Sequence, residues 1–343
     1  MFSKFRLISL TVLLAAIFSI SACSTISEKI SNVVTEPPEL NLLSGRAGAN
    51  GPVLVVKIDD TKFARPQVGL EYADVVYIEQ VEGGLTRLAA VFSSTIPEKI
   101  GPVRSARISD IELLAQYGRV GFAFSGAQHK LLPVIAAANL FDIGAMRRGP
   151  NFYKNDPLRM QPYAMFLSAK ALMANEVGLG NQIEKSRNMG WTFSDKLVNE
   201  GFEITDVVMH WPAQKYSAQW NTAASRWFLN VNSAPDVSDL GINLGPTTLV
   251  IQLVSITPSE YGDKFGGNTP FSQTVGTGKG YVLRDGVAIP ATWHRLDEAS
   301  PTTWTDSVGD EIKFAPGQIW VALTDKEPDF TRKPASAPSP TSK

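Results

Sequence analysis

Residues 53–94 read VLVVKIDDTKFARPQVGLEYADVVYIEQVEGGLTRLAAVFSS, and this stretch sets the fold of the first half of the chain. The apolar run at 53–58, bounded by Gly51-Pro52 and two aspartates, predicts a buried strand. Two more strands are predicted at 74–79 and 85–92, and Gly83-Gly84 between them indicates a tight turn. The stretch therefore predicts a sheet with an early hairpin.

Further along, helices are predicted at 109–116, 131–140 and 168–174, and a strand at 120–124 lies between the first two. Alternating strands and helices are typical of an α/β layer, and the hairpin makes its sheet mixed. Beyond residue 204 short strand-like runs are separated by Gly, Pro, Asn and Asp, with a hairpin turn at Asp285-Gly286. The predicted fold class is α+β: an α/β domain with a mixed sheet over 51–190, and a mainly-β domain over 204–325.

The N-terminus has the pattern of a secretory signal. Lys4 and Arg6 precede an apolar run at 7–20, which is too short to span a hydrocarbon core of roughly 30 Å as a helix. The run ends in Ile20-Ser21-Ala22-Cys23. Residues 1–22 are thus predicted to be a lipoprotein signal peptide. Cys23 is expected to carry a diacylglycerol that anchors the chain to the cell membrane on its extracytoplasmic face.

Composition limits the remaining possibilities. Residues 23–50 are rich in small and polar residues and predict a flexible tether, and 326–343 predict a disordered tail. Cys23 is the sole cysteine, so no internal disulfide or thiolate metal site can form. The 32 basic and 33 acidic residues nearly balance, which argues against bulk binding to nucleic acid.

Two segments carry a family resemblance: 57–94, and 97–118 with the sequence PEKIGPVRSARISDIELLAQYG. Their Glu-Gly-Gly-x-Thr-Arg and Ile-Gly-Pro-Val-Arg-Ser-Ala-Arg motifs resemble the YerB-like bacterial lipoproteins, and a looser similarity extends over 51–324. The resemblance implies a two-domain fold and a cell-envelope location. The activity of that family is undefined, so no catalytic residue can be carried over. One departure stands out, because the family's Pro-His-Asn is replaced here by Pro162-Tyr163-Ala164.

The candidate site lies in the first domain. Arg104 and Arg107 are three residues apart and, if helical, would project from one face near the helix start. Guanidinium groups side by side repel each other and need anions, which are either carboxylates of the fold or a ligand's carboxylate or phosphate. The predicted ligand-binding residues are Arg65, Arg87, Arg104, Arg107 and Asp59, and the candidate internal anions are Asp59, Glu79 and Glu82.

We favour a binding role, with a cell-wall component such as peptidoglycan, a small anionic ligand or a wall-synthesis protein as the partner. The alternative is a hydrolase of wall glycan or peptide that uses Glu79, Glu82 or Asp59 as acid and base. A third possibility is that the first domain is a scaffold and the tryptophan-rich second domain contacts partners. The three histidines, His129, His210 and His294, are too far apart in the sequence to match the short spacing of metal-ligand motifs. Neither a metal nor a cofactor is predicted.

Overall fold

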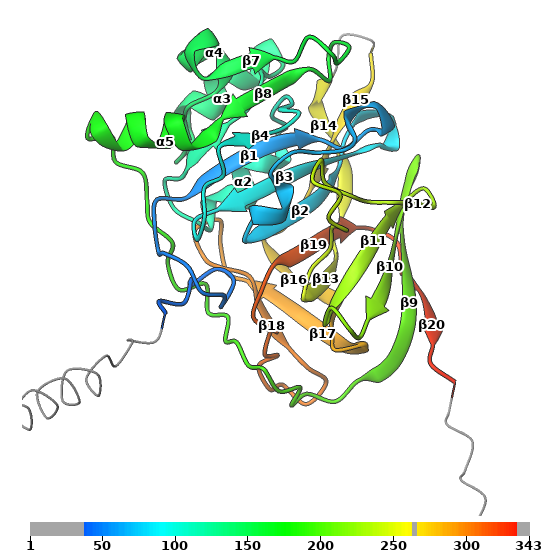
Figure 1. Cartoon of the computed structure of the whole chain (residues 1–343). Coiled ribbons are helices and arrows are strands. Elements are labelled where there is room, and N and C mark those ends of the chain that lie inside the picture. The colour runs from blue at the N-terminus through cyan, green and yellow to red at the C-terminus, as the bar shows by residue number, and fades with distance from the viewer. Residues whose placement is uncertain (1–37, 263–265, 335–343) are drawn as a thin grey trace, which may run out of the picture. The chain divides into compact units, whose positions relative to one another are not determined.

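The computed structural model describes residues 38–262 and 266–334, and one compact unit begins at Glu39. It is an α+β fold with few helices (Figure 1). The first half contains β1 (Leu54–Asp59), β2 (Val75–Gln80), β3 (Thr86–Phe92), β4 (Lys99–Ile100), α2 (Ser109–Ala115), β5 (Gly121–Ala123), α3 (Leu132–Ala137), β6 (Phe141–Asp142), α4 (Ala145–Arg148), β7 (Tyr153–Asn155), β8 (Met165–Ser168) and α5 (Ala169–Gly178).

The second half consists of strands. They are β9 (Phe202–Trp211), β10 (Gln214–Asn221), β11 (Arg226–Val231), β12 (Ala234–Pro235), β13 (Thr248–Leu253), β14 (Ile256–Gly262), β15 (Asn268–Ser272), β16 (Gly276–Arg284), β17 (Val287–Arg295), β18 (Thr303–Thr305), β19 (Ile319–Thr324) and β20 (Asp329–Arg332). The predicted α+β class, with a mixed sheet first and a mainly-β region second, is confirmed.

A 15-stranded sheet runs through both halves. Its first-half part has the order β2-β3-β1-β5-β6, in which β3 pairs antiparallel with β2 and β1, while β5 runs parallel to β1. The predicted early hairpin is thus β2–β3. In the second half β16 and β17 form the hairpin expected at Asp285-Gly286, and both turn residues have positive φ, at 53° and 74°.

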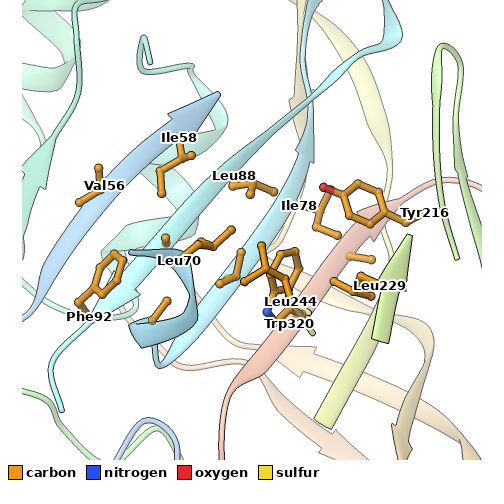
Figure 2. Close-up of a cluster of buried hydrophobic side chains, with 14 of the residues drawn as sticks. Val56, Ile58, Leu70, Ile78, Leu88, Phe92, Tyr216, Leu229, Leu244 and Trp320 are labelled. Atoms are coloured by element: carbon orange, nitrogen blue, oxygen red, sulfur yellow. The ribbon is translucent and has the colours of Figure 1, made fainter. Parts of the chain in front are cut away.

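The two halves meet at β19, which lies between β13 and β2 and runs parallel to both. Trp320 of β19 is fully buried, packs 6.4 Å from the Tyr216 ring, and donates its indole N–H to Gln318 at 2.8 Å. Figure 2 shows Trp320 among apolar side chains of both halves, which include Ile78 of β2 and Leu229 of β11. One hydrophobic core therefore crosses the boundary between the predicted domains.

The tryptophans of the second half pack in two buried clusters: Trp211, Trp220, Trp227 and Trp320 in this core, and Trp293 and Trp304 in a second one. Trp211, Trp227 and Trp293 are buried, as are Trp304 and Trp320, and Trp220 is half-buried against Trp227. Three of their indole N–H groups donate to backbone carbonyls: that of Trp211 to Leu323 at 2.9 Å, that of Trp227 to Leu283 at 3.2 Å and that of Trp293 to Leu253 at 3.0 Å. Buried rings with satisfied polar ends are packing elements. The five buried rings are therefore not exposed to solvent.

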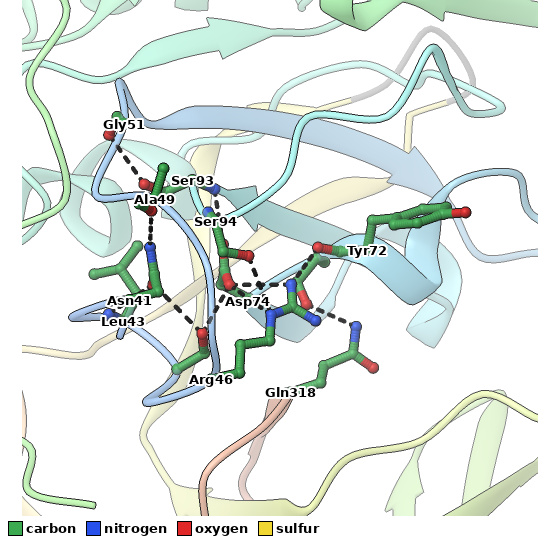
Figure 3. A network of polar contacts seen from close by, with 12 residues as sticks. Asn41, Leu43, Arg46, Ala49, Gly51, Tyr72, Asp74, Ser93, Ser94 and Gln318 are labelled. Carbon is green, nitrogen blue, oxygen red and sulfur yellow. Dashed lines mark hydrogen bonds and ion pairs between the residues drawn. The ribbon is translucent and has the colours of Figure 1, made fainter. Parts of the chain in front are cut away.

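The predicted tether differs from the structure over residues 39–50. Asn41, Leu43 and Ser44 are buried, and the segment is held by Asp74, which directly precedes β2 (Figure 3). One carboxylate oxygen of Asp74 accepts from Ser44 Oγ at 2.8 Å and Arg46 Nε at 3.0 Å. The other accepts backbone N–H groups of residues 93 and 94, at 2.7 and 2.8 Å. Several polar side chains of the segment thus form hydrogen bonds with the fold.

We expect Asp74→Asn to lower the free energy of unfolding by about 2–3 kcal/mol, because the amide presents a donor to the N–H groups that now find an acceptor. Chemical denaturation followed by circular dichroism measures the change. Asp325→Asn at a surface ion pair is the matched control, with an expected change under about 0.5 kcal/mol. Equal losses for the two variants would contradict the anchoring role of Asp74.

The predicted tail also differs in part. Residues 329–332 form β20, which pairs antiparallel with β9, and the Phe330 ring packs 5.2 Å from Phe202 and 4.9 Å from Tyr281. The prolines around Phe330 led to the prediction of disorder, but its ring packs against the second half. Residues 335–343, the predicted signal peptide and Cys23 lie outside the described residues. None of the described helices is long and apolar enough to cross a membrane.

Candidate functional site

A cleft of about 620 Å³ opens where β1 and β2 end and β3 begins. Asp59 is the last residue of β1, Glu82 follows β2, and Arg87 lies in the second position of β3. Asp59 and Arg87 are cross-strand partners, so their side chains share one face of the sheet. The edge of the sheet beyond the ends of β1 and β2 thus collects the polar side chains.

The Gly83-Gly84 turn positions Glu82 at this edge. Both glycines have positive φ, at 69° and 70°, in the short 3-10 turn Glu82–Gly84. A Cβ on Gly84 would lie 2.5 Å from Pro212 Cβ, so there is also no space for a side chain at this position. The predicted tight turn is confirmed, and it explains why this motif contains two glycines.

Arg104 and Arg107 reach the cleft from a segment that is neither helix nor strand, so the condition under which they would share one helix face is not met. Helix α2 begins only at Ser109. Before it, the Arg104 N–H donates to the Lys57 carbonyl at 2.8 Å, and the Arg104 carbonyl accepts from the Ser125 N–H at 2.9 Å. The backbone is therefore held between β1 and the 125–126 loop, where its hydrogen bonds replace those of a helix.

Two of the three cleft arginines are neutralised by carboxylates. Arg104 Nε donates to Asp59 Oδ2 at 2.6 Å, and Arg107 Nε donates to Glu82 Oε2 at 2.9 Å. Thr269 of β15 also donates to Glu82. Burial raises the pKa of Glu82, but Arg107 and these hydrogen bonds outweigh it and lower the pKa below its usual value. Glu82 is therefore an ionised partner of Arg107.

Arg87 has no carboxylate partner within the described part of the chain. Its side chain is nearly buried, and toward the residues that the structure describes it makes one hydrogen bond, from Nη1 to the Ser105 carbonyl at 3.0 Å. Burial and the charges of Arg107 and Arg104 lower the pKa of Arg87. Three guanidinium groups thus face two carboxylates across this cleft, which leaves one positive charge uncompensated.

Glu79 does not belong to the cleft. It is fully buried beneath it and forms ion pairs with Lys57, which also binds Asp110 at 2.7 Å. Burial and the Asp110 carboxylate raise the pKa of Glu79, against the effect of Lys57. Glu79 and Glu82 therefore cannot act on one substrate in this cleft, because only Glu82 lines it.

Arg65 is also outside the cleft. Its guanidinium forms ion pairs with Asp60 and Asp236, and Asp60 accepts a further hydrogen bond from the Tyr216 hydroxyl at 2.7 Å. Asp236 and Tyr216 come from the second half of the chain, so this buried cluster joins the two halves. The structure gives Arg65 a structural role instead of the predicted ligand-binding role, because both of its terminal nitrogens pair with carboxylates.

Several cleft residues were not predicted as site residues. Tyr261 and Thr269 come from the β14–β15 hairpin of the second half, and Tyr163 comes from the loop before β8. Tyr163 could have been singled out from the sequence, since it stands where the resembling family has histidine. Nothing in the sequence pattern indicates that β14–β15 reaches a cleft of the first half, because that contact joins residues 187 positions apart, as in the Thr269–Glu82 pair.

The comparisons with known proteins agree with this architecture. Residues 42–181 match the model "Protein of unknown function (DUF3048) N-terminal domain", and residues 207–321 match its C-terminal domain. A protein of Bacillus subtilis (strain 168) named "Putative lipoprotein YerB" is 54% identical over 56 residues, which is 16% of this chain and 17% of that protein. The alignment thus spans about one sixth of that relative.

The crystal structure of the YerB protein from Bacillus subtilis has the same fold. It superposes with a TM-score of 0.71 at 19% identity and covers 86% of this chain and 100% of that one. With both domain models matched in order along the sequence, the two halves seen here are the two domains of that architecture. The chain belongs to the DUF3048 family of YerB-like proteins.

Proposed function

We propose that this chain is a lipid-anchored binding module on the extracytoplasmic face of the cell membrane, and that its cleft holds an anionic group of a cell-envelope component. The observation that carries the proposal is Arg87, a nearly buried guanidinium without a carboxylate partner among the described residues. A buried charge is costly unless it is paired. A ligand carboxylate or phosphate supplies the missing anion.

The donors left free in the cleft fit such a group. Asp59 and Glu82 bind their arginines through Nε. Within residues 38–262 and 266–334, neither Nη of Arg104 nor Nη2 of Arg107 donates a hydrogen bond. Guanidinium N–H groups that converge from different segments bind carboxylate and phosphate oxygens in fixed directions. A ligand with one negative charge would also bring the cleft to neutrality.

The anchor part of the proposal rests on the N-terminal sequence. Ile20-Ser21-Ala22-Cys23 follows the apolar run directly, as a lipoprotein processing site does. The name of the Bacillus subtilis relative supports the same location. A diacylglycerol on Cys23 would keep the cleft close to the membrane surface and to the wall components assembled there.

No structural observation favours the hydrolase alternative. An acid–base pair needs two carboxyl groups at one substrate, with the acid held protonated by a raised pKa. Glu79 lies outside the cleft, Asp59 accepts from Arg104 and Thr61, and the pKa of Glu82 is lowered. Hydrolysis stays an untested prediction, and the binding experiment below also measures it.

We expect Arg87→Met to weaken ligand binding at least ten-fold, which corresponds to about 1.4 kcal/mol or more for a lost charge-assisted contact. The chain from Ser24 to Lys343 is incubated with purified peptidoglycan and with muropeptides, and the retained fraction is measured by sedimentation. Arg332→Met at an exposed position of β20 is the matched control and is expected to bind like the unmodified chain.

Mass spectrometry of the same samples reports cleavage, with Glu82→Gln and Arg104→Ala alongside. Retention without cleavage, weakened by Arg87→Met and Arg104→Ala, supports the binding module. Cleavage abolished by Glu82→Gln would replace it with the hydrolase. If the unmodified chain neither retains nor cleaves these ligands, and neither acetate nor glycerol 1-phosphate titrates the cleft, then the cleft is not an anion site.

A further inference from the structure

Three large apolar side chains are exposed beside the cleft. Phe63, Leu158 and Met160 have 64%, 93% and 71% of their surface exposed. We call these three residues the apolar rim. Single exposed apolar residues are common on protein surfaces, but three on two contacting loops at the mouth of a polar cleft form a patch that indicates a binding surface.

The two loops of the rim are held together and to the cleft. The guanidinium of Arg159, between Leu158 and Met160, donates to the Ala64 carbonyl at 2.9 Å and to the Pro66 carbonyl at 2.7 Å. The Phe63 ring packs 5.6 Å from the ring of Tyr163, which itself lines the cleft. The apolar rim is thus continuous with the cleft wall through Tyr163.

Cationic side chains flank the apolar rim. Lys62 precedes Phe63, Arg159 lies within the second loop, and Lys130 follows the cleft-lining His129. No ion pair is recorded for Lys62, Lys130 or Arg159 within residues 38–262 and 266–334. Lys62 and Lys130 are exposed, so their charge is available to a partner.

We propose that this face docks on an anionic membrane, with the apolar rim inserted at the headgroup boundary and a lipid phosphate in the arginine cleft. The proposal rests on the proposed function and names the class of its anionic ligand. An exposed apolar patch flanked by cations is the pattern by which proteins lie on anionic membrane surfaces. The uncompensated charge of Arg87 gives the phosphate a defined place behind that patch.

A lipid explains the combination better than a soluble anion does. A soluble phosphate or a muropeptide carboxylate would use the arginines and leave the apolar rim in water. A lipid headgroup in a membrane places its phosphate next to the apolar boundary, so the two features are used together. Cations at the edge add attraction to neighbouring anionic headgroups, which salt weakens.

The test uses the unlipidated chain Ser24–Lys343, which contains the whole compact unit and has no acyl group of its own. Binding to vesicles of phosphatidylcholine and of phosphatidylglycerol is measured by sedimentation, and binding of glycerol 1-phosphate by calorimetry. The double variant Phe63→Ser/Met160→Ser removes part of the rim. Leu296→Ser/Val308→Ser, at side chains 73% and 80% exposed elsewhere, is its matched control.

We expect phosphatidylglycerol vesicles to bind at least ten-fold more tightly than phosphatidylcholine vesicles. The rim variant is expected to lose at least ten-fold on phosphatidylglycerol and to keep its glycerol 1-phosphate affinity, while the control changes neither. Arg87→Met is expected to weaken both. All four substituted apolar side chains are exposed, so we expect both variants to melt at the temperature of the unmodified chain. Matching melting temperatures show that a loss of binding does not come from unfolding.

Vesicle binding unchanged in the rim variant, or absent from the unmodified chain, overturns the membrane proposal. Retention of muropeptides that depends on Arg87 would then leave the proposed function intact and assign the cleft to a wall carboxylate. Loss of every Arg87-dependent interaction, soluble and vesicle-bound alike, would reject both the proposed function and this inference.

Discussion

Replacing Lys57 with methionine is expected to lower the free energy of unfolding by about 3–5 kcal/mol, because it leaves two carboxylates buried without their cation. Lys57 Nζ binds Glu79 and Asp110, and all three side chains are fully inaccessible to solvent. One oxygen of Glu79 already lacks a hydrogen-bond partner. Urea denaturation followed by tryptophan fluorescence measures the loss.

The pH dependence of this loss has a definite sign. Burial raises the pKa of Glu79 above its unfolded value, so the folded chain binds the extra proton, and stability falls as pH rises through the titration. Without Lys57 this effect strengthens, so the deficit of Lys57→Met should grow from acid to neutral pH. Adding Glu79→Gln should recover part of the loss at neutral pH. A small, pH-independent deficit would show that the cluster is hydrated.

Replacing Trp320 with alanine is expected to cost about 3–5 kcal/mol and to destabilise both halves of the chain in one transition. The indole fills the core between β2 and the second half, and the neighbouring Gln318 amide donates to the carbonyls of Leu70 and Ala73, both at 2.9 Å. Losing the ring therefore removes contacts on both sides of β19.

The matched control is Trp220→Ala, since Trp220 is half-buried on β10 and its removal leaves a smaller cavity. Calorimetry shows the number of transitions, and pulse proteolysis shows which half is cut first. Two separate transitions in the unmodified chain, with only one of them shifted by Trp320→Ala, would contradict a shared core.

Local pattern predicted the first-half sheet well. The apolar runs of β1, β2 and β3 are bounded by turn residues, and the Gly83-Gly84 and Asp285-Gly286 turns occur where their chemistry requires them. The pattern did not predict that β19 connects the first-half and second-half parts of the sheet. The pairing of Val75 with Ile319 depends on surfaces that are complementary only after folding. Long-range pairing leaves no periodic trace in the sequence.

The site was predicted only in part, because local motifs can be read from the sequence and long-range partners cannot. Asp59, Glu82 and Arg87 meet because short motifs place them at strand ends, and Arg104 and Arg107 join them from the segment that precedes α2. Glu79 and Arg65 were placed wrongly, because the alternation of a strand does not say which charged side chain finds a buried partner. Their partners lie on other segments: Glu79 pairs with Lys57 of β1, which also binds Asp110 of α2, and Arg65 pairs with Asp236 of the second half.

The position of β19 has a consequence for the order of folding if the chain is exported as proposed. The N-terminal part would emerge first, so β2 and β13 would cross the membrane before residues 319–324 arrive to lie between them. Until then both strands present an open edge that can pair with another chain. Folding of the sheet thus waits until residues 319–324 are available, and contacts of such sequence separation form slowly. We expect truncations just before residue 319 to aggregate or to be degraded during secretion, whereas loss of residues 335–343 leaves the sheet complete.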